Sequence, residues 1–197
     1  MITHIKGRLV EKTPTYAVVD CNGVGYFINI SLNTYSKLGD EEAVMFYTHF
    51  AVREDAQVLF GFADQEERRL FRHLISVSGV GPSTARMVLS SMSPEEMIQS
   101  VVSGNVMAIQ KVKGIGAKSA QRIIIDLRDK LAKEGAVSSG SPDSLSLDNK
   151  TVEDALSALL MLGFAKNAAE KAIGQVVKTE GSELSVEDLL KAALKIL

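Results

Sequence analysis

The sequence predicts an α+β chain of several domains, in which a five-stranded β-barrel precedes a duplicated helical motif and a three-helix bundle. Apolar residues alternate with a period near two over residues 1–62, helical periodicity begins at Asp64, and one glycine-containing motif recurs after 35 residues. With 197 residues, 46% of them hydrophobic, the chain can bury more than one core. The expected limits are 1–64 for the barrel, 65–134 for the duplicated motif, 135–150 for a flexible linker and 151–197 for the bundle.

The first 62 residues are rich in β-branched and aromatic side chains, which is typical of short strands. We expect strands over 2–11, 15–21, 25–31, 44–52 and 57–62. Asn22-Gly23 suits the positive φ values of a tight hairpin, and one helical turn fits within residues 31–39. Five such strands favour a small closed or partly open barrel, and a plain five-stranded meander is the alternative.

A helical pattern starts at Asp64-Gln-Glu-Glu67, which has the spacing of a capping box. Further on, Gly79-Val80-Gly81 and Gly114-Ile115-Gly116 each stand between two apolar helical runs. Residues 94–102 are expected to form a connecting helix. Because the residues around the two glycine pairs also correspond, we interpret them as two copies of one helix–turn–helix unit.

A Gly-apolar-Gly turn before a helix can form an anion site. Glycine allows a left-handed turn, the apolar residue can enter the core, and the following helix presents unpaired N–H groups with a partial positive charge. The candidate contacts are Gly79, Val80, Gly81, Ser83, Thr84 and Arg86 in the first copy, and Lys111, Lys113, Gly114, Ile115, Gly116, Lys118, Ser119 and Arg122 in the second. Contacts of this kind fix a protein on a nucleic-acid backbone without reading its sequence.

The charge distribution supports this interpretation. Residues 65–134 hold 11 Lys and Arg against 7 Asp and Glu, whereas the segments on either side each have a net charge of −3. A concentrated cationic segment is typical of a phosphate-binding surface, although an ordinary solvated helical face is the alternative.

Several other classes are disfavoured. A dinucleotide-binding loop fails because Thr84 and Ser119 stand where its third glycine belongs, and neither copy follows a strand. The single cysteine and three scattered histidines give no reason to expect a disulfide, a metal or any other cofactor. The longest uncharged stretch, residues 21–36, is too short and polar for a membrane span, and no signal peptide is evident. We expect a cytoplasmic protein without a membrane partner.

The paired motifs resemble helix-hairpin-helix elements and, with the preceding barrel, the chain resembles the RuvA family of Holliday-junction-binding proteins. The supporting segments are residues 1–9, 22–26, 48–57, 59–62 and 67–71, which follow one another in the family's order. One position departs from the pattern, because Ser83 stands where family members often carry a basic residue. The first hairpin should therefore depend more on backbone amides and on the hydroxyl of Ser83 or Thr84.

The resemblance implies an OB-like barrel, a tandem helix-hairpin-helix domain and a UBA-like bundle of three helices. It also implies a non-catalytic protein that holds four-way junctions open and loads the RuvB hexameric ATPase for branch migration in recombination and repair. The implied partners are junction DNA, RuvB, the RuvC resolvase and further copies of the chain, as one or two homotetramers on a junction.

Two smaller groups of residues gain a role from the same resemblance. Glu54 and Asp55, at a turn between strands, match an acidic pin at the junction centre, and a merely solvated turn is the alternative. Leu159, Leu162 and Phe164 match the contact motif for the motor, and a bundle core is the alternative.

The last segment has three helical patterns. Thr151 and Ser185 have the spacing of N-caps for the first and third, and Gly163 should end the first.

Two other functional classes remain open. One is a helix-hairpin-helix repair enzyme, such as a glycosylase or nuclease, although Asp126 and Asp129 look like partners of neighbouring cations rather than metal ligands. The other is a protein adaptor, which the duplicated basic hairpins disfavour.

Overall fold

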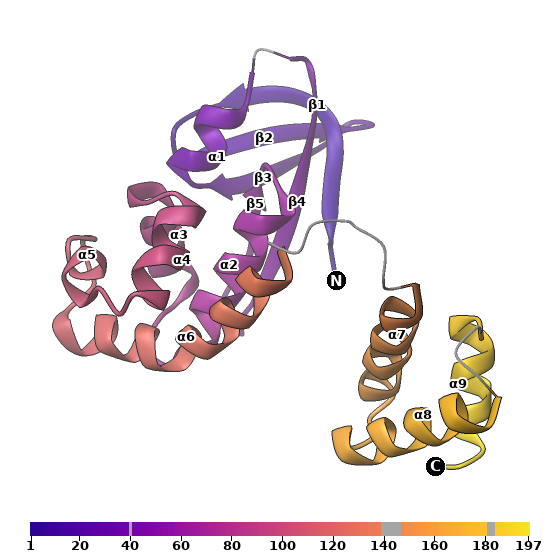
Figure 1. The fold of residues 1–197 in the computed structure, drawn as a ribbon. Helices are drawn as coiled ribbons and strands as arrows, with labels where there is room; N and C mark the ends of the chain where they lie inside the picture. The colour runs from indigo at the N-terminus through magenta and orange to yellow at the C-terminus, as the bar shows by residue number, and fades with distance from the viewer. Residues whose placement is uncertain (40, 139–146, 181–183) are drawn as a thin grey trace. The chain divides into compact units, whose positions relative to one another are not determined.

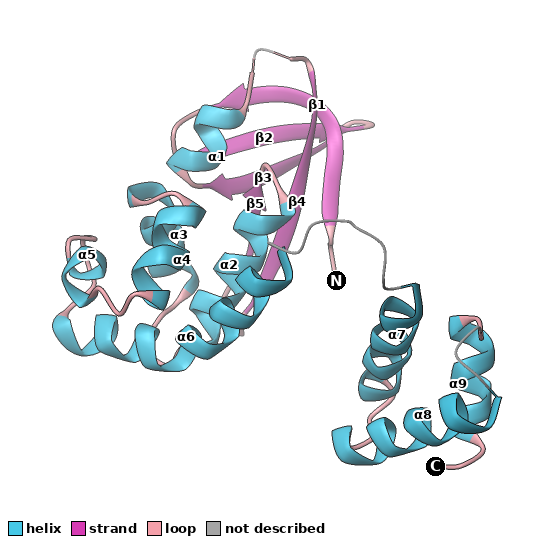
Figure 2. Ribbon diagram, in the orientation of Figure 1, coloured by secondary structure: helices cyan, strands magenta, loops and turns pink. Residues whose placement is uncertain are grey.

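The computed structural model describes residues 1–39, 41–138, 147–180 and 184–197. The chain forms two compact units, Met1–Gly140 and Ser141–Leu197, and each is described by itself (Figures 1 and 2).

The first unit begins with a closed barrel. Its strands are β1 (His4–Lys12), β2 (Tyr16–Cys21), β3 (Val24–Ile30), β4 (Ala43–Val52) and β5 (Gln57–Phe62). They pair in the order β1-β2-β3-β5-β4, and the β1–β4 pairing closes the barrel. Among the pairings of these described strands, only β3–β5 is parallel, which a simple meander would not contain. The barrel interpretation is therefore confirmed over the meander.

The connections of the barrel follow the local sequence. Asn22 and Gly23 have φ values of 54° and 88°, and Asp20 Oδ1 accepts a 2.7 Å hydrogen bond from the Gly23 N–H. This is the expected hairpin between β2 and β3. The expected helical turn is α1 (Leu32–Lys37), whose N-cap Ser31 accepts a hydrogen bond from the Thr34 N–H.

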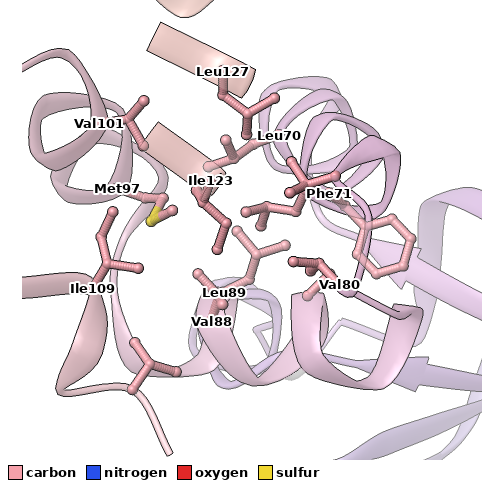
Figure 3. Packing of buried hydrophobic residues seen from close by; sticks show 14 of the residues in the cluster. Leu70, Phe71, Val80, Val88, Leu89, Met97, Val101, Ile109, Ile123 and Leu127 are labelled. Atoms are coloured by element: carbon pink, nitrogen blue, oxygen red, sulfur yellow. The ribbon is translucent and has the colours of Figure 1, made fainter. Parts of the chain in front are cut away.

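Five further helices complete the first unit. They are α2 (Gln65–Ser76), α3 (Pro82–Ser91), α4 (Pro94–Val102), α5 (Val106–Gln110) and α6 (Ala117–Ser138). Their buried side chains form one apolar cluster (Figure 3). The cluster also includes Phe60 and Phe62 from β5. Because barrel residues belong to the helical core, the two parts pack as one body.

The predicted linker differs from the observed helix ends. Residues 135–138 belong to α6, residues 147–150 belong to the next helix, and residues 139–146 lie outside the described part. A glycine inside a helix costs only about 1 kcal/mol, so Gly135 does not end α6. No proline follows until Pro142, so nothing obliges the helix to stop earlier.

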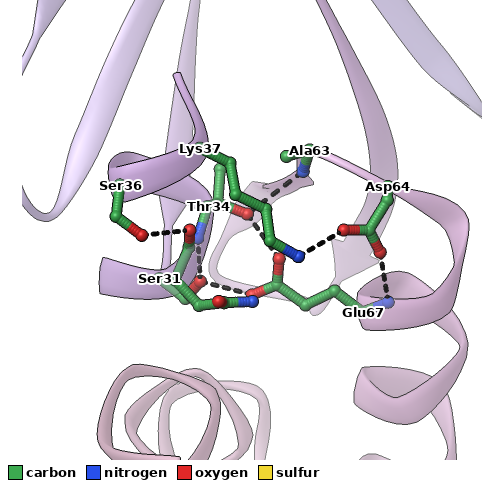
Figure 4. Close-up of polar contacts among 8 residues, drawn as sticks. Ser31, Thr34, Ser36, Lys37, Ala63, Asp64 and Glu67 are labelled. Atoms are coloured by element: carbon green, nitrogen blue, oxygen red, sulfur yellow. Dashed lines mark hydrogen bonds and ion pairs between the residues drawn. The ribbon is translucent and has the colours of Figure 1, made fainter. Parts of the chain in front are cut away.

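A polar network fixes α2 against the barrel (Figure 4). The Glu67 side chain is fully buried and accepts hydrogen bonds from the hydroxyls of Ser31 and Thr34, the latter at 2.7 Å. Burial raises the pKa of Glu67, and the two hydroxyl hydrogen bonds offset this only in part. Beside it, Lys37 donates to Asp64 at 2.8 Å, and this hydrogen bond raises the pKa of Lys37.

The second unit contains α7 (Leu147–Met161), α8 (Lys166–Glu180) and α9 (Val186–Leu194) around one apolar cluster. The predicted N-cap at Thr151 is wrong, because α7 begins four residues earlier and Thr151 lies inside it. Nothing in residues 147–150 breaks a helix, so the Thr-x-x-Asp pattern does not mark its start. Ser185 does cap α9, and its Oγ accepts a 3.2 Å hydrogen bond from the Asp188 N–H.

No helix in the described part of the chain is long and apolar enough to cross a membrane.

Candidate nucleic-acid interface

The two glycine-containing turns have the same backbone geometry. Gly79 and Gly114 have φ values of 87° and 90°, a region that side chains with a Cβ rarely adopt. The Val80 N–H bonds the carbonyl three residues earlier at 3.0 Å, and the Ile115 N–H makes the equivalent bond at 3.1 Å. The repeat in the sequence therefore gives a repeat in the structure, with α2 and α3 flanking the first turn and α5 and α6 the second.

The residue between the glycines anchors each turn. Val80 is 5% exposed and Ile115 is 6% exposed, and both belong to the apolar cluster of the helices. Figure 3 shows Val80 within this cluster. Their side chains therefore cannot contact DNA. Their contribution to an interface is to hold the neighbouring backbone in place.

Each turn leads directly into a helix start. In the first, Gly81 is the N-cap and has no side chain with which to cap α3, and the first intrahelical bond runs from the Ala85 N–H to the Gly81 carbonyl at 2.9 Å. In the second, the equivalent bond runs from the Ala120 N–H to the Gly116 carbonyl, also at 2.9 Å. The N–H groups of the preceding residues have no intrahelical acceptor and form the positive end of the helix dipole.

The second hairpin carries most of the available charge. Lys111, Lys113 and Lys118 are exposed, and within the described part of the chain their ammonium groups have neither a hydrogen bond nor an ion pair. Arg122 lies 3.7 Å from the carboxylate of Asp126, one helical turn further on. Such an exposed pair is weak, so Arg122 can still turn towards a phosphate.

The first hairpin is different, and one predicted contact has another role there. Arg86 donates 3.0 Å hydrogen bonds to the Thr15 carbonyl and to Asn29 Oδ1, so its side chain fixes α3 to the barrel. Arg86 therefore has a structural role in the free protein, and its predicted contact with DNA stays a prediction. Ser83 is exposed and Thr84 half-buried, so the first hairpin offers hydroxyls where the second offers ammonium groups.

The turn between β4 and β5 lies beside the first hairpin. The Arg53 N–H bonds the Ala56 carbonyl at 2.8 Å, which places Glu54 and Asp55 at the exposed tip. A Cβ built on Gly81 would lie 4.0 Å from Nη2 of Arg53. Arg53 is not among the residues predicted from the sequence, because only the fold brings this arginine next to Gly81.

Comparisons with known proteins agree with this architecture. The family model for the RuvA N terminal domain matches residues 1–61, a SAM-like helix-hairpin-helix tandem matches 71–129, and the RuvA C-terminal domain matches 150–197. A curated protein of Christiangramia forsetii, the Holliday junction branch migration complex subunit RuvA, is 52% identical over the full length of both chains. Proteins of the same name from Cytophaga hutchinsonii and Bacteroides fragilis are 46% and 47% identical, again over the whole of each chain. The chain belongs to the RuvA family.

Membership of the RuvA family confirms the predicted fold class of an OB-like barrel, a tandem of helix-hairpin-helix elements and a separate C-terminal domain. In this RuvA-family chain, the described C-terminal unit consists of three helices, as the sequence predicts.

The three predicted motor contacts lie in different environments within the RuvA C-terminal domain. Gly163 ends α7 with a φ of 95°, and the Phe164 N–H bonds the Leu159 carbonyl at 3.1 Å. In this Schellman arrangement the side chains before and after the turn pack together. Leu159 is fully buried and Phe164 packs against the same core, so the core interpretation applies to Leu159. Leu162, in contrast, is 64% exposed.

Proposed function

We propose that the protein binds four-way DNA junctions in a structure-specific way, as the DNA-binding subunit of a branch migration complex. The observation that carries this proposal is the pair of equivalent hairpins, each with unpaired N–H groups at a helix start and both held by one apolar core. The names of the full-length relatives support it, because they are Holliday junction branch migration complex subunits.

The hairpins would hold phosphates rather than read bases. Backbone N–H groups and lysine side chains bind phosphate oxygens wherever they occur, so they fix position without sequence specificity. A second hairpin in the same rigid body allows two phosphate groups to be held at a fixed spacing. The candidate residues of both copies are therefore assigned to the DNA backbone, with Val80 and Ile115 acting through their neighbours' main chain.

Glu54 and Asp55 would supply the preference for a junction. Both are exposed at the tip of a tight turn next to the first hairpin. Carboxylates repel phosphates, so a continuous duplex crossing this tip costs free energy that the splayed arms of a junction avoid. This is the acidic-pin role.

The C-terminal unit would recruit the RuvB hexameric ATPase. Its exposed apolar residues at the end of α7, Leu160, Met161 and Leu162, are 41%, 88% and 64% exposed. Exposed apolar patches are typical of protein interaction sites. Within this proposal the chain is a non-catalytic cytoplasmic subunit that forms homotetramers, one or two on each junction, and shares the junction with the RuvC resolvase.

Two measurements on the full-length protein test the proposal. In a gel-shift titration, a labelled four-way junction should bind more tightly than a linear duplex of the same arm sequence, and incubation with Mg²⁺ should release no cleaved product. Equal affinity for both DNAs would contradict junction recognition, and cleavage or base release would indicate a repair enzyme.

Motor loading is tested separately with Leu162→Ala. Because Leu162 is exposed, this variant should keep its fold and its junction affinity but stimulate the RuvB ATPase less than the wild type does. Ser157→Ala, an exposed change on the same helix, is the matched control. Unchanged stimulation by Leu162→Ala would exclude this patch as the motor contact.

A further inference from the structure

The first hairpin lacks the lysines of the second, yet positive charge reaches it from another part of the fold. A pocket of about 160 Å³ lies between the β4–β5 turn and the start of α3. Its lining includes Arg53 and Asp55 from the turn, and Pro82, Ser83 and Arg86 from α3. Two arginines and one aspartate therefore line the same space beside the first hairpin.

Neither guanidinium is neutralised by an acid in the described structure. Arg86 bonds there to two neutral oxygens, the Thr15 carbonyl and Asn29 Oδ1, so its positive charge still acts on the pocket. The exposed Arg53 guanidinium has neither a hydrogen bond nor an ion pair within the described residues. A planar guanidinium with unused donors suits a phosphate, which it can bind with two parallel hydrogen bonds.

Building on the proposed junction binding, we propose that Arg53 is the phosphate-binding side chain of the first hairpin. It would supply, from the barrel, the positive charge that Ser83 does not. The position of Nη2, 4.0 Å from where a Cβ on Gly81 would lie, puts the guanidinium next to the N-cap of α3 and its unpaired N–H groups. A phosphate at this helix start would meet Arg53 on one side and the backbone of Ser83 and Thr84 on the other.

The β4–β5 turn would then have two opposing actions within three residues. Arg53 attracts the backbone of an arm that lies on the first hairpin, while Glu54 and Asp55 repel DNA that crosses the tip. Because Arg53 acts on a phosphate that any DNA can offer, its removal should weaken junction and duplex together. Removal of the acids should have the opposite sign.

The test measures the junction affinity of full-length Arg53→Gln over a series of salt concentrations. Each protomer that loses its arginine–phosphate interaction should flatten the log–log salt dependence by about 0.9, which corresponds to about eightfold weaker binding at 0.1 M salt for every protomer on the junction. Arg8→Gln is the matched control, since it removes the same charge from an exposed residue that pairs with Asp20 at 3.2 Å. The first hairpin reaches the barrel at Thr15, through Arg86, just before β2 begins at Tyr16. Asp20 lies near the other end of β2. Arg8→Gln should therefore leave the salt dependence unchanged.

The double variant Arg53→Gln/Ser83→Lys tests whether a positive charge at position 83 can replace the charge of Arg53. If Arg53 replaces a basic residue of the hairpin, a lysine at position 83 should restore both the affinity and the salt dependence. The proposal is overturned if the salt slope of junction binding is the same for Arg53→Gln, Arg8→Gln and the wild type. It is also overturned if Arg53→Gln weakens junction binding and Ser83→Lys does not restore it. Failure of the proposed function itself would look different, because the wild-type protein would then show no preference for the junction.

Discussion

The two helix-hairpin-helix elements have the same backbone geometry but lie in different surroundings. Their glycines have φ values of 87° and 90°, and their turn hydrogen bonds differ by only 0.1 Å. The second is surrounded by Lys111, Lys113 and Lys118 from its own segment. The first has no lysine nearby in sequence and instead lies against the barrel, where Arg86 and the β4–β5 turn adjoin it.

This difference shows that the geometry of an anion site and its affinity for the anion have separate origins. The glycine turn and the buried residue between its glycines determine where the N–H groups point, and both copies share this. The side chains around the turn determine how strongly a phosphate is held, and here each copy obtains its charge from a different source. A duplicated motif can therefore keep its shape while its two copies change their electrostatics independently.

The largest expected effect comes from removing the charge of the second hairpin. Replacing Lys111, Lys113 and Lys118 together with alanine should weaken junction binding at about 0.1 M salt by two to three orders of magnitude for every protomer bound, because each phosphate-bound lysine contributes about 0.9 to the salt slope. Lys118→Ala alone should flatten the slope by about one unit for every protomer bound and weaken binding equally for all DNA sequences. Gel-shift titrations at several salt concentrations measure both.

Lys178→Ala, an exposed lysine in the last turn of α8, serves as the control for this series. If Lys118→Ala has the same salt slope as the wild type, the second hairpin does not face DNA, and the charge contrast between the hairpins has no bearing on binding.

A smaller effect is expected at the acidic tip beside the first hairpin. Glu54→Gln/Asp55→Asn removes two charges with little change in size, so binding to all DNA should become severalfold tighter, and most of all for linear duplex. The preference for junctions should then decrease, and the change should shrink at high salt, where screening shortens the reach of exposed charges to a few ångströms. Selectivity identical to that of the wild type would leave only a solvated turn.

The smallest effect concerns the contact that holds α2, and with it the first hairpin, to the barrel. The pKa of Glu67 is raised by burial above its ordinary value of 4.5, so the folded chain binds this proton more tightly than the unfolded chain does. The contribution of Glu67 to the free energy of unfolding should therefore be greatest below about pH 4.5 and decrease as the pH rises through the folded pKa, by at most about 1.4 kcal/mol per pH unit. Glu67→Gln cannot titrate and should lack this decrease.

Urea denaturation of both proteins between pH 4.5 and 8 measures the difference. The wild type should lose stability relative to Glu67→Gln as the pH rises. A constant difference over the whole range would mean that Glu67 has the same pKa in the folded and unfolded chains.

Much of this architecture could be predicted from local sequence. The strand alternation, the Asn22-Gly23 turn, the N-caps at Asp64 and Ser185 and the end of α7 at Gly163 are observed as predicted, because each depends on the conformational preferences of a few adjacent residues. The predicted N-cap at Thr151 is wrong because its pattern spans too few residues. A Thr-x-x-Asp pattern has a cap's spacing, but the preceding residues decide whether a helix has already begun.

Site residues with long-range partners were less predictable. Arg86 and Leu159 have the residue types of a DNA contact and an apolar anchor, and only the fold shows that Arg86 also bonds to the barrel and that Leu159 is buried in the bundle core. Leu162, three residues after Leu159, is exposed because α7 ends there and its last turn leaves the core. Which side of a helix end faces the interior depends on the packing of α8 and α9, and no local pattern contains that information.

Local sequence is enough to specify the elements of this protein, the duplication of its hairpin and the anion-binding shape of each copy. These follow from backbone preferences and side-chain periodicity, which act over fewer than ten residues. The lysines of the second copy are also local. The surroundings of the first copy arise in the folded chain, which brings Thr15 and Asn29 to Arg86, buries Glu67 against Ser31 and Thr34, and places Arg53 beside Gly81. Charge and burial act through space, so the environment of a residue depends on what the closed barrel and the helical core place around it.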